Sequence, residues 1–343
     1  MNKSRFYCLV FVDYELFQNI FIFVTNKKMN LLYITKNVEK YIIHHSVFKP
    51  HEPGDKMIPP EFDYHAPTSV TEAIHLLSEL GDDAKILAGG HSLLPMMKLR
   101  FAEPAHLIDL NRIPQLRGIK EEGGLIKIGA MTVENEILHS DLLKEKVALL
   151  PDAVRWIADP QVRNRGTIGG DIAHGDPAND HPAIAMALDA TFLLQGPQGV
   201  RSVKAVDFFQ GTYMTDMAAN EILTEIHIAP LPQNTGCAYI KLKRKTGDWA
   251  TAAAAVVLQM SQGKVTKVSI GLTNVADTAI RATQAEQLLI GKELTDEVLS
   301  QVAAAVSAVC HPADDLRGDA EYKTAMAGEM TKRALLAASA KIS

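Results

Sequence analysis

Two glycine pairs decide how this sequence folds: Leu87-Ala88-Gly89-Gly90-His91-Ser92 (loop 1) and Thr167-Ile168-Gly169-Gly170-Asp171 (loop 2). Each pair stands near a hydroxyl residue. Glycine adopts positive φ and lets a ligand come close to the main-chain amides. Successive amides then form a concavity that holds anionic oxygens. Two such loops from distant parts of the chain can clamp a pyrophosphate from both sides, so the pattern predicts a dinucleotide cofactor.

The alternative is that these glycines form ordinary turns, as Gly123-Gly124 is expected to do at a hairpin tip. The two usual nucleotide motifs are missing from the sequence. Neither G-x-G-x-x-G at the start of a helix nor G-x-x-x-x-G-K-[ST] occurs. A standard NAD or ATP fold is therefore disfavoured.

Composition narrows the class of protein. The 343 residues are 47% hydrophobic and 22% charged, which is typical of a folded protein of about two or three domains. A formal net charge of −5 gives no electrostatic reason to expect nucleic acid or an anionic membrane as a partner. The three cysteines, Cys8, Cys237 and Cys310, are too few and too far apart for an iron–sulfur cluster or structural zinc. Their use fits a reducing cytoplasm.

Residues 1–56 differ from the rest of the chain. They contain no alanine, yet hold ten of the 19 Phe and Tyr residues. The apolar stretch Leu9–Val24 is interrupted by four polar residues and makes a poor membrane span. No signal peptide is recognisable. The segment is either an accessory extension or translated upstream sequence before a start at Met57, and the sharp change in composition favours the second.

From Met57 onward the elements follow a readable order. Apolar spacing predicts a helix over 71–80 that stops at Gly81, then a strand over 84–88 that ends in loop 1. A helix over 91–100 and a strand over 106–110 complete a β-α-β arrangement. Further helices are predicted at 147–157, 183–188, 283–289, 296–309 and 321–340, and further strands at 125–128, 132–133, 190–195, 222–228, 239–243, 251–260 and 264–272. The last three strands resemble an antiparallel meander.

Residues 171–181 are dense in possible metal ligands, namely Asp171, His174, Asp176, Asp180 and His181. Glycine and proline make this stretch a loop instead of a helix that sets ligands at i and i+4, which disfavours a metal site. A serine hydrolase centred on Ser92 is disfavoured because no G-x-S-x-G surrounds it. Recognition of a cofactor is the favoured interpretation.

Two side chains suit cofactor recognition. Asp180 could accept a hydrogen bond from a ribose or ring donor. Trp249 could stack on a planar ring system, although a core or rim position is its alternative.

From Met57 to the C-terminus the chain resembles the FAD-binding medium subunits of molybdenum hydroxylases, most of all those of the aerobic carbon monoxide dehydrogenase type. Met57-Ile58-Pro59 and Phe62-Asp63-Tyr64 look like the start of that family. Loops 1 and 2 look like its two flavin pyrophosphate loops. The resemblance supports the exclusion of residues 1–56 from the fold.

The resemblance implies an α+β fold. A two-subdomain FAD-binding domain of the PCMH type, similar to vanillyl-alcohol oxidase, is expected at 57–231, with subdomains at about 57–112 and 113–231. A C-terminal flavoprotein domain with a three-stranded antiparallel sheet and helices is expected at 232–343.

The resemblance also implies the site, with FAD as the cofactor, no metal and no catalytic residue in this chain. Trp249 stands where relatives usually have a tyrosine beside the isoalloxazine. The implied FAD contacts are Ala88, Gly89, Gly90, His91, Ser92, Thr167, Ile168, Gly169, Gly170, Asp171, Asp180, Leu223, Lys241 and Trp249.

In the implied complex, a large molybdopterin subunit oxidises the substrate and a small subunit with two [2Fe-2S] clusters conducts the electrons. This chain's flavin would pass them to a quinone-type acceptor. A dimer of heterotrimers is expected, in the cytoplasm, with peripheral association at the inner face of the membrane. The alternatives are a medium subunit acting with a xanthine, aldehyde or N-heterocycle dehydrogenase, or a structural subunit without a cofactor.

Overall fold

The computed structural model describes residues 8–13, 17–25, 28–33, 42–43 and 58–342, and the chain divides into two units, Met1–Ile58 and Pro59–Ser343. The first unit contains a four-stranded antiparallel sheet whose strands lie in chain order. They are β1 (Cys8–Asp13), β2 (Phe17–Thr25), β3 (Lys28–Tyr33) and β4 (Ile42–Ile43). Met57, on which the expected start depends, lies outside the described residues.

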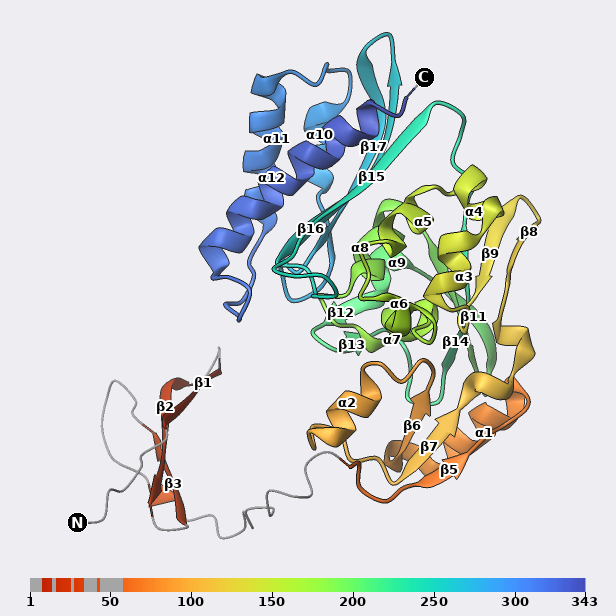
Figure 1. Ribbon diagram of the computed structural model, residues 1–343, viewed down its shortest axis with the longest axis vertical. Coiled ribbons are helices and arrows are strands. Elements are labelled where there is room, and N and C mark those ends of the chain that lie inside the picture. Colours follow the sequence, from red (N-terminus) through yellow and green to blue (C-terminus); the bar gives the residue numbers. More distant parts are fainter. Residues whose placement is uncertain (1–7, 14–16, 26–27, 34–41, 44–57, 343) are drawn as a thin grey trace. The chain divides into compact units, whose positions relative to one another are not determined.

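The second unit begins with a small parallel sheet in the order β5-β7-β6 (Figure 1). Its strands are β5 (Asp63–His65), β6 (Ala84–Leu87) and β7 (His106–Asp109), with helices α1 (Val70–Leu80) and α2 (Leu93–Lys98) between them. The predicted β-α-β arrangement is confirmed. Helix α1 begins where the Ser69 hydroxyl accepts from the Glu72 amide and ends at Gly81, whose φ is 58°. Helix α2 is shorter than predicted, because loop 1 continues through Ser92 and Arg100 turns with a φ of 64°.

A five-stranded antiparallel sheet follows, in the order β11-β10-β14-β9-β8. Its strands are β8 (Ile119–Glu122), β9 (Leu125–Gly129), β10 (Thr191–Gly196), β11 (Gly199–Lys204) and β14 (Ile222–Ile228). Gly123 and Gly124 join β8 to β9 with φ values of 63° and 75°, which confirms the predicted hairpin tip. The predicted strand over 132–133 is wrong, since Val133 only forms an isolated bridge with Thr167.

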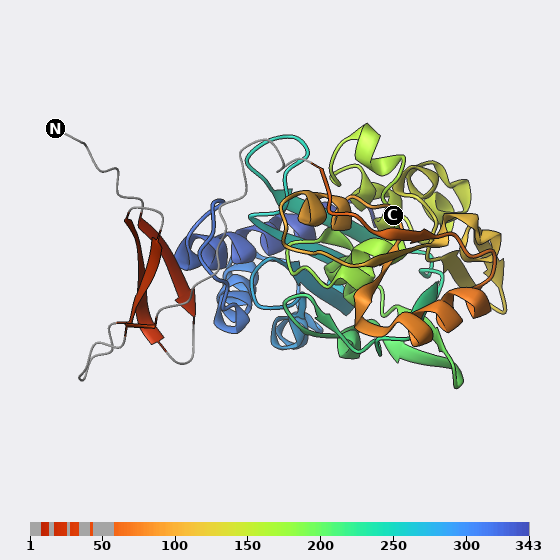
Figure 2. The ribbon, with the colours of Figure 1, turned by 90° about the horizontal axis from the view of Figure 1, so that it is seen from below.

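Short helices fill the space between this sheet and the C-terminal part. They are α3 (Glu134–His139), α4 (Asp141–Lys146), α5 (Leu149–Val154), α6 (Pro160–Arg163), α7 (Ile168–His174), α8 (Asp180–Ala187) and α9 (Ala205–Phe208). Two short strands, β12 (Phe209–Gly211) and β13 (Met214–Thr215), pair with each other, and 3-10 helices cover Gly81–Asp83, Leu110–Arg112 and Pro114–Leu116. Every residue of α8 is buried, as a helix enclosed on all sides requires. Seen from below, the small sheet and α1 lie nearest the viewer in this unit, in front of these helices (Figure 2).

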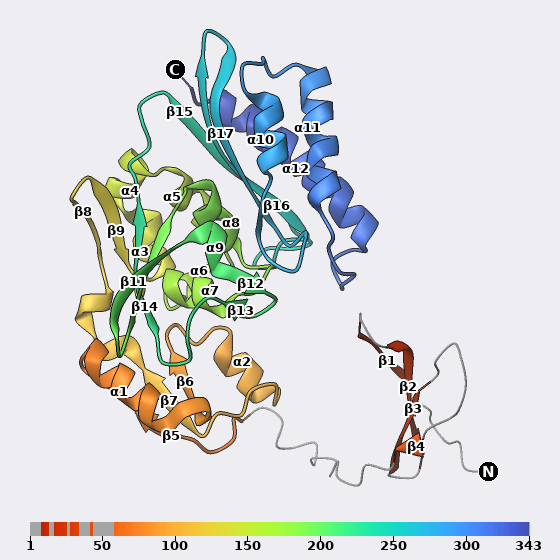
Figure 3. The same cartoon turned by 180° about the vertical axis from the view of Figure 1, so that it is seen from behind.

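The C-terminal sheet is an antiparallel meander of three long strands, as predicted, with a two-residue fourth strand added at its edge. Its strands are β15 (Thr235–Leu242), β16 (Ala252–Ser261), β17 (Lys264–Thr273) and β18 (Ile280–Arg281). Helices α10 (Thr283–Leu289), α11 (Asp296–Val309) and α12 (Ala320–Ser339) cover one face, and α8 lies on the other (Figure 3). The predicted helix at 283–289 and the one at 296–309 are confirmed to the residue.

Both faces of β16 are buried, and its alternating side chains enter two different cores. Ala253, Ala255 and Val257 join the core that contains α5 and α8, while Ala254 and Val256 join the core beneath α11 and α12. The first core therefore runs without a break from the five-stranded sheet into the C-terminal sheet.

Helix α8 and strand β17 approach each other at backbone distance. A Cβ built on Gly271 would stand 2.0 Å from the carbonyl oxygen of Ala183, so only glycine allows this packing. The two-domain division of residues 57–343 remains a prediction, since the structure groups 59–343 as one unit. Within the described residues, no helix combines the length and the apolar character needed to cross a bilayer.

Candidate functional site

Loops 1 and 2 meet in space, although they lie far apart in the sequence. A Cβ built on Gly89 would come within 2.6 Å of the Arg165 carbonyl oxygen and 2.8 Å of the Gly166 Cα, in the turn that leads into loop 2. A Cβ built on Gly170 would lie 3.3 Å from the Cβ of Ala88. Gly89 of loop 1 and Gly170 of loop 2 thus let the two loops pack directly together.

Loop 1 is held open by its own side chains and neighbours. The imidazole of His91 donates from Nδ1 to the carbonyl oxygen of Gly89 over 2.9 Å, and the Asn111 amide donates to the carbonyl oxygen of Ala88 over 3.0 Å. The main-chain N–H groups of Gly90, His91 and Ser92 donate no hydrogen bond to any described residue. Such a run of unpaired amides is suited to an anion.

Loop 2 is the start of α7. The Thr167 hydroxyl accepts from the Gly170 amide over 3.2 Å, and the Gly169 amide donates to the Ala130 carbonyl oxygen over 2.9 Å. A Cβ on Gly169 would lie 2.4 Å from that of Ala130. Gly169 is therefore required for the packing of loop 2 on the chain behind it, and the space it leaves is already filled by protein.

A cleft of about 660 Å³ opens along both loops, a size usual for a cofactor site. It runs from loop 1 to the beginning of α8 and to β15. Eleven of the 14 predicted contact residues line it: Ala88, Gly89, Gly90, His91, Ser92, Thr167, Gly170, Asp171, Asp180, Lys241 and Trp249. Ile168 and Gly169 belong to loop 2 but are buried away from the cleft, and Leu223 lies on β14 in the hydrophobic core, so these three are not part of the wall of the cleft.

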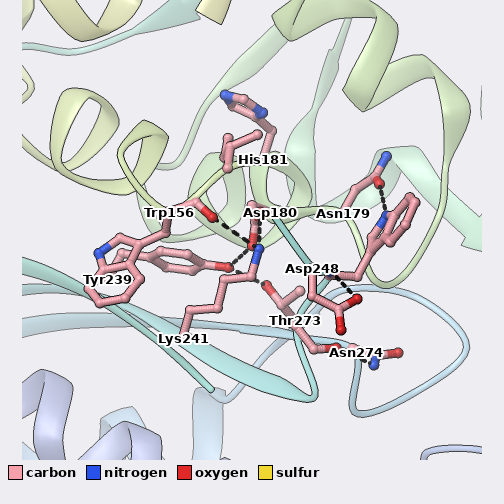
Figure 4. Close-up of polar contacts among 12 residues, drawn as sticks. Trp156, Asn179, Asp180, His181, Tyr239, Lys241, Asp248, Thr273 and Asn274 are labelled. Atoms are coloured by element: carbon pink, nitrogen blue, oxygen red, sulfur yellow. Dashed lines mark hydrogen bonds and ion pairs between the residues drawn. The ribbon is translucent and has the colours of Figure 1, made fainter. Parts of the chain in front are cut away.

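Asp180 and Lys241 form a buried ion pair at the far end of the cleft. Lys241 Nζ lies 2.7 Å from Asp180 Oδ2, and the two side chains are 1% and 7% exposed. The Tyr239 hydroxyl donates a short hydrogen bond to the other carboxylate oxygen (Figure 4). Burial raises the pKa of Asp180, while the ammonium and the hydroxyl oppose that rise. The pair joins α8 to β15 and places a charged hydrogen-bond donor in the wall of the cleft.

Trp249 lies at the edge of the cleft and is 46% exposed. Its indole nitrogen is 3.4 Å from the Asn179 side-chain oxygen, and the Arg317 guanidinium lies 5.3 Å from the ring centroid. Asp248 holds Arg317 in place through an ion pair of 3.0 Å. The core alternative for Trp249 is thus wrong, and a rim position with a free ring surface is what the structure has.

His181, one of the possible ligands in the stretch where a metal site was disfavoured, contacts two carboxylates. Its Nδ1 lies 3.0 Å from Asp171 Oδ2 and its Nε2 lies 3.3 Å from Glu134 Oε2. Among the described residues, no group of three or more His, Cys, Asp or Glu side chains is arranged so that it could hold a metal ion. In Figure 4 the His181 ring points away from Lys241, while Asp180, its neighbour in the chain, points toward it.

Glu134, Asn179 and Tyr239 were not found from the sequence. Asn179 directly precedes α8, a position where an amide or carboxylate side chain is common, and its side chain donates to the Asp171 carbonyl oxygen over 3.0 Å. No local pattern marked Glu134 or Tyr239, because each reaches the site only through long-range packing.

Comparison with known families decides the class. Residues 60–232 match the model of the FAD-binding domain in molybdopterin dehydrogenase, and residues 237–338 match that of the CO dehydrogenase flavoprotein C-terminal domain. The chain belongs to the FAD-binding medium chains of the molybdopterin dehydrogenases. The expected resemblance and the α+β fold class are confirmed.

The alignments with individual relatives extend over nearly the whole length of each relative. This medium chain is 61% identical to the carbon monoxide dehydrogenase medium chain of Hydrogenophaga pseudoflava over 285 residues, 83% of this chain and 99% of that protein. The corresponding protein of Afipia carboxidovorans is 51% identical over 285 residues, again 83% and 99%. The solved carbon monoxide dehydrogenase of Hydrogenophaga pseudoflava matches with a TM-score of 0.83 at 62% identity, covering 84% of this chain and all of that one. Quinoline 2-oxidoreductase of Pseudomonas putida 86 matches at 0.79 and 33%, covering 83% and 99%.

The residues of the cleft fit FAD. The unpaired amides of loop 1 suit a diphosphate, the cleft is large enough for a dinucleotide, and an exposed indole face lies at its rim. These features come from this structure and agree with the family assignment.

Proposed function

We propose that this medium chain carries FAD in a carbon monoxide dehydrogenase, with the diphosphate between loops 1 and 2 and the ring system toward Lys241 and Trp249. The observation that carries the proposal is the direct packing of the two glycine loops around one cleft. Bound FAD would supply the chemistry of accepting electrons singly and releasing them in pairs.

Loop 1 would hold the diphosphate by its unpaired amides and the Ser92 hydroxyl, and Thr167 would fix loop 2 opposite. Because the amides are already oriented by packing, binding costs little further ordering of the chain. Gly169 and Ile168 would shape loop 2 on its side away from the cleft, and Leu223 would support the site by packing in the core.

Lys241 would orient the ring end and Trp249 would cover it. The Lys241 ammonium is held by Asp180, which leaves it fixed and charged within a low-dielectric wall. The Trp249 indole is anchored on one side by Asn179 and Arg317, and nearly half of it is exposed for contact with a planar group. Together these groups would exclude water from the ring.

Other subunits would complete the path of the electrons. With only three cysteines in the chain, the [2Fe-2S] clusters would belong to a small subunit and the molybdopterin to a large one. We place the complex in the cytoplasm as a dimer of heterotrimers that reaches the inner face of the membrane peripherally, where a quinone-type acceptor takes the electrons.

Carbon monoxide as the substrate of the complex is favoured by the 61% identity to a medium chain of that enzyme over almost its full length. A glyceraldehyde dehydrogenase medium chain and a xanthine dehydrogenase FAD-binding subunit are 39% and 28% identical to this chain. They support the same cofactor role in this chain with a different large subunit.

The test is to purify the full-length chain with its co-expressed partner subunits and record its visible spectrum. We expect about one FAD per chain, and bleaching of the flavin bands when carbon monoxide is added to the complex. A complex from which acid extraction releases no FAD would contradict the cofactor assignment, since the [2Fe-2S] clusters colour the complex by themselves. Bleaching by an aldehyde or a purine, but not by carbon monoxide, would contradict the substrate.

A further inference from the structure

The wall of the cleft contains many acidic side chains for a site that would receive a diphosphate. Two lysines line it, Lys85 and Lys241. The six lining carboxylates are Asp82, Glu134, Asp171, Asp180, Glu221 and Asp248. Each carboxylate without a cation beside it would repel the phosphates, so the structure must compensate these charges.

Three of the carboxylates have a lysine or arginine. Asp180 pairs with Lys241 at 2.7 Å. Glu221 pairs with Arg201 at 2.7 Å, and Asp248 is held by two arginines at 3.0 Å. Of the three that remain, Asp82 is exposed to solvent, which screens it.

Glu134 and Asp171 share one partner, His181. The imidazole is 1% exposed, and each of its nitrogens faces a different carboxylate, Asp171 at 3.0 Å and Glu134 at 3.3 Å. The main-chain N–H of His181 also donates to Asp171 Oδ2 over 3.3 Å. A ring with a carboxylate at both nitrogens is stabilised as the imidazolium cation.

The same histidine fixes the geometry of loop 2. Asp171 lies in the first turn of α7 and its side chain is 23% exposed, so it faces both the cleft and His181. His181 lies in the first turn of α8, next to Asp180. The ion pair therefore ties the glycine loop to the helix that holds Lys241.

We propose that His181 is a positioning residue of the FAD site, whose imidazolium neutralises Asp171 so that loop 2 accepts the diphosphate. This inference rests on the proposed function. It assigns a role to a residue that lies outside the wall of the cleft and would act through Asp171.

The protonation of the cluster agrees with this role. Burial lowers the pKa of His181, but Glu134 and Asp171 outweigh it and raise the value to about 9. Burial raises the pKa of Glu134 to about 8. The other charged groups that act on the pair are Asp180 and Arg163. Above these values the cluster loses its protons and becomes more negative, so FAD should bind less tightly.

The experiment measures the dissociation constant of FAD for the full-length chain from pH 6 to pH 10, after removal and readdition of FAD. His181→Gln should raise the constant at pH 7 by about tenfold or more, because Asp171 is left as an uncompensated charge. The double variant D171N/H181Q should bind FAD more tightly than H181Q, since the charge that repels the diphosphate is removed from Asp171. The exposed His139→Gln is the control and should bind as the wild type does.

The pH dependence gives a second readout that a purely structural residue would not produce. Wild-type affinity should decrease above about pH 8 to 9, and the double variant should show a much smaller decrease. Unchanged affinity in H181Q, or a double variant as weak as H181Q, would overturn this inference alone. A wild-type chain that binds no FAD would overturn the proposed function itself.

Discussion

Replacing Gly89 by alanine tests the contact between the two loops. The added Cβ would stand 2.6 Å from the Arg165 carbonyl oxygen, whereas 3.4 Å is the lower limit of ordinary contact, so loop 1 must retreat by about 0.8 Å. The nearest atom belongs to the backbone, which cannot rotate away as a side chain would. Overpacking of this kind costs about 1–3 kcal/mol of folding stability. The retreat also weakens the amide contacts to the diphosphate, and the loss of two hydrogen bonds raises the FAD dissociation constant by about tenfold to a hundredfold.

Isothermal titration of FAD and urea unfolding of the FAD-free chain separate the two effects. Gly211→Ala is the matched control, because its Cβ would have only ordinary contacts, the nearest at 3.6 Å. It should leave both the affinity and the stability within error of the wild type. Wild-type affinity in Gly89→Ala would refute the reasoning that backbone packing between the loops forms the site.

Three further changes test other parts of the site. Asp180→Ala leaves the Lys241 ammonium buried without its carboxylate and should lower the free energy of unfolding by about 3–5 kcal/mol. A double variant that also carries Lys241→Met should recover part of this loss. An undiminished free energy of unfolding in the single variant would contradict the buried pair. Trp249→Ala should change stability by less than about 1 kcal/mol, since the side chain is 46% exposed, while flavin fluorescence should increase; unchanged fluorescence would remove Trp249 from the ring site. The thermal midpoint of the FAD-free chain should fall as pH rises from 7 to 10, because the pKa of His181 is raised to about 9 in the folded state. Protonated His181 stabilises the fold fully below its unfolded pKa of about 6.5, and this contribution is lost as the pH rises to about 9. Glu134 acts in the same direction, since its pKa is raised to about 8. If the thermal midpoint fell with pH equally in the wild type and in His181→Gln, this assignment would be contradicted.

Local patterns were sufficient for the elements that frame the cleft. The apolar stripe and Gly81 predicted α1, and the strand before loop 1 followed from a short apolar run. The alanine-rich stretch 251–260 was placed in an antiparallel meander with the strands before and after it, and the pairing of β16 confirms this. These features depend on residues close together in the chain, so periodicity and turn residues are sufficient to predict them.

The remaining parts depend on contacts between distant segments. The meeting of Lys241 and Tyr239 with Asp180 requires the docking of β15 against α8, about sixty residues apart in the sequence. Leu223 was assigned through the resemblance alone, and it is buried in the core next to an irregularity in the register of β14 and β10. The ligand-rich stretch 171–181 was interpreted as a site of cofactor recognition, and its side chains divide between partners on α3 and β15, which local sequence could not indicate.

The backbone contact between Gly271 and Ala183 limits how this protein can be recombined with its relatives. A chimera that joined residues 60–232 to the C-terminal part of another medium chain would place a foreign strand against α8. Any residue larger than glycine at the position of Gly271 would push that helix, and with it Asp180 and His181, out of register. The FAD-binding part and the C-terminal part must therefore be exchanged together, or the contact between Gly271 and Ala183 must be kept.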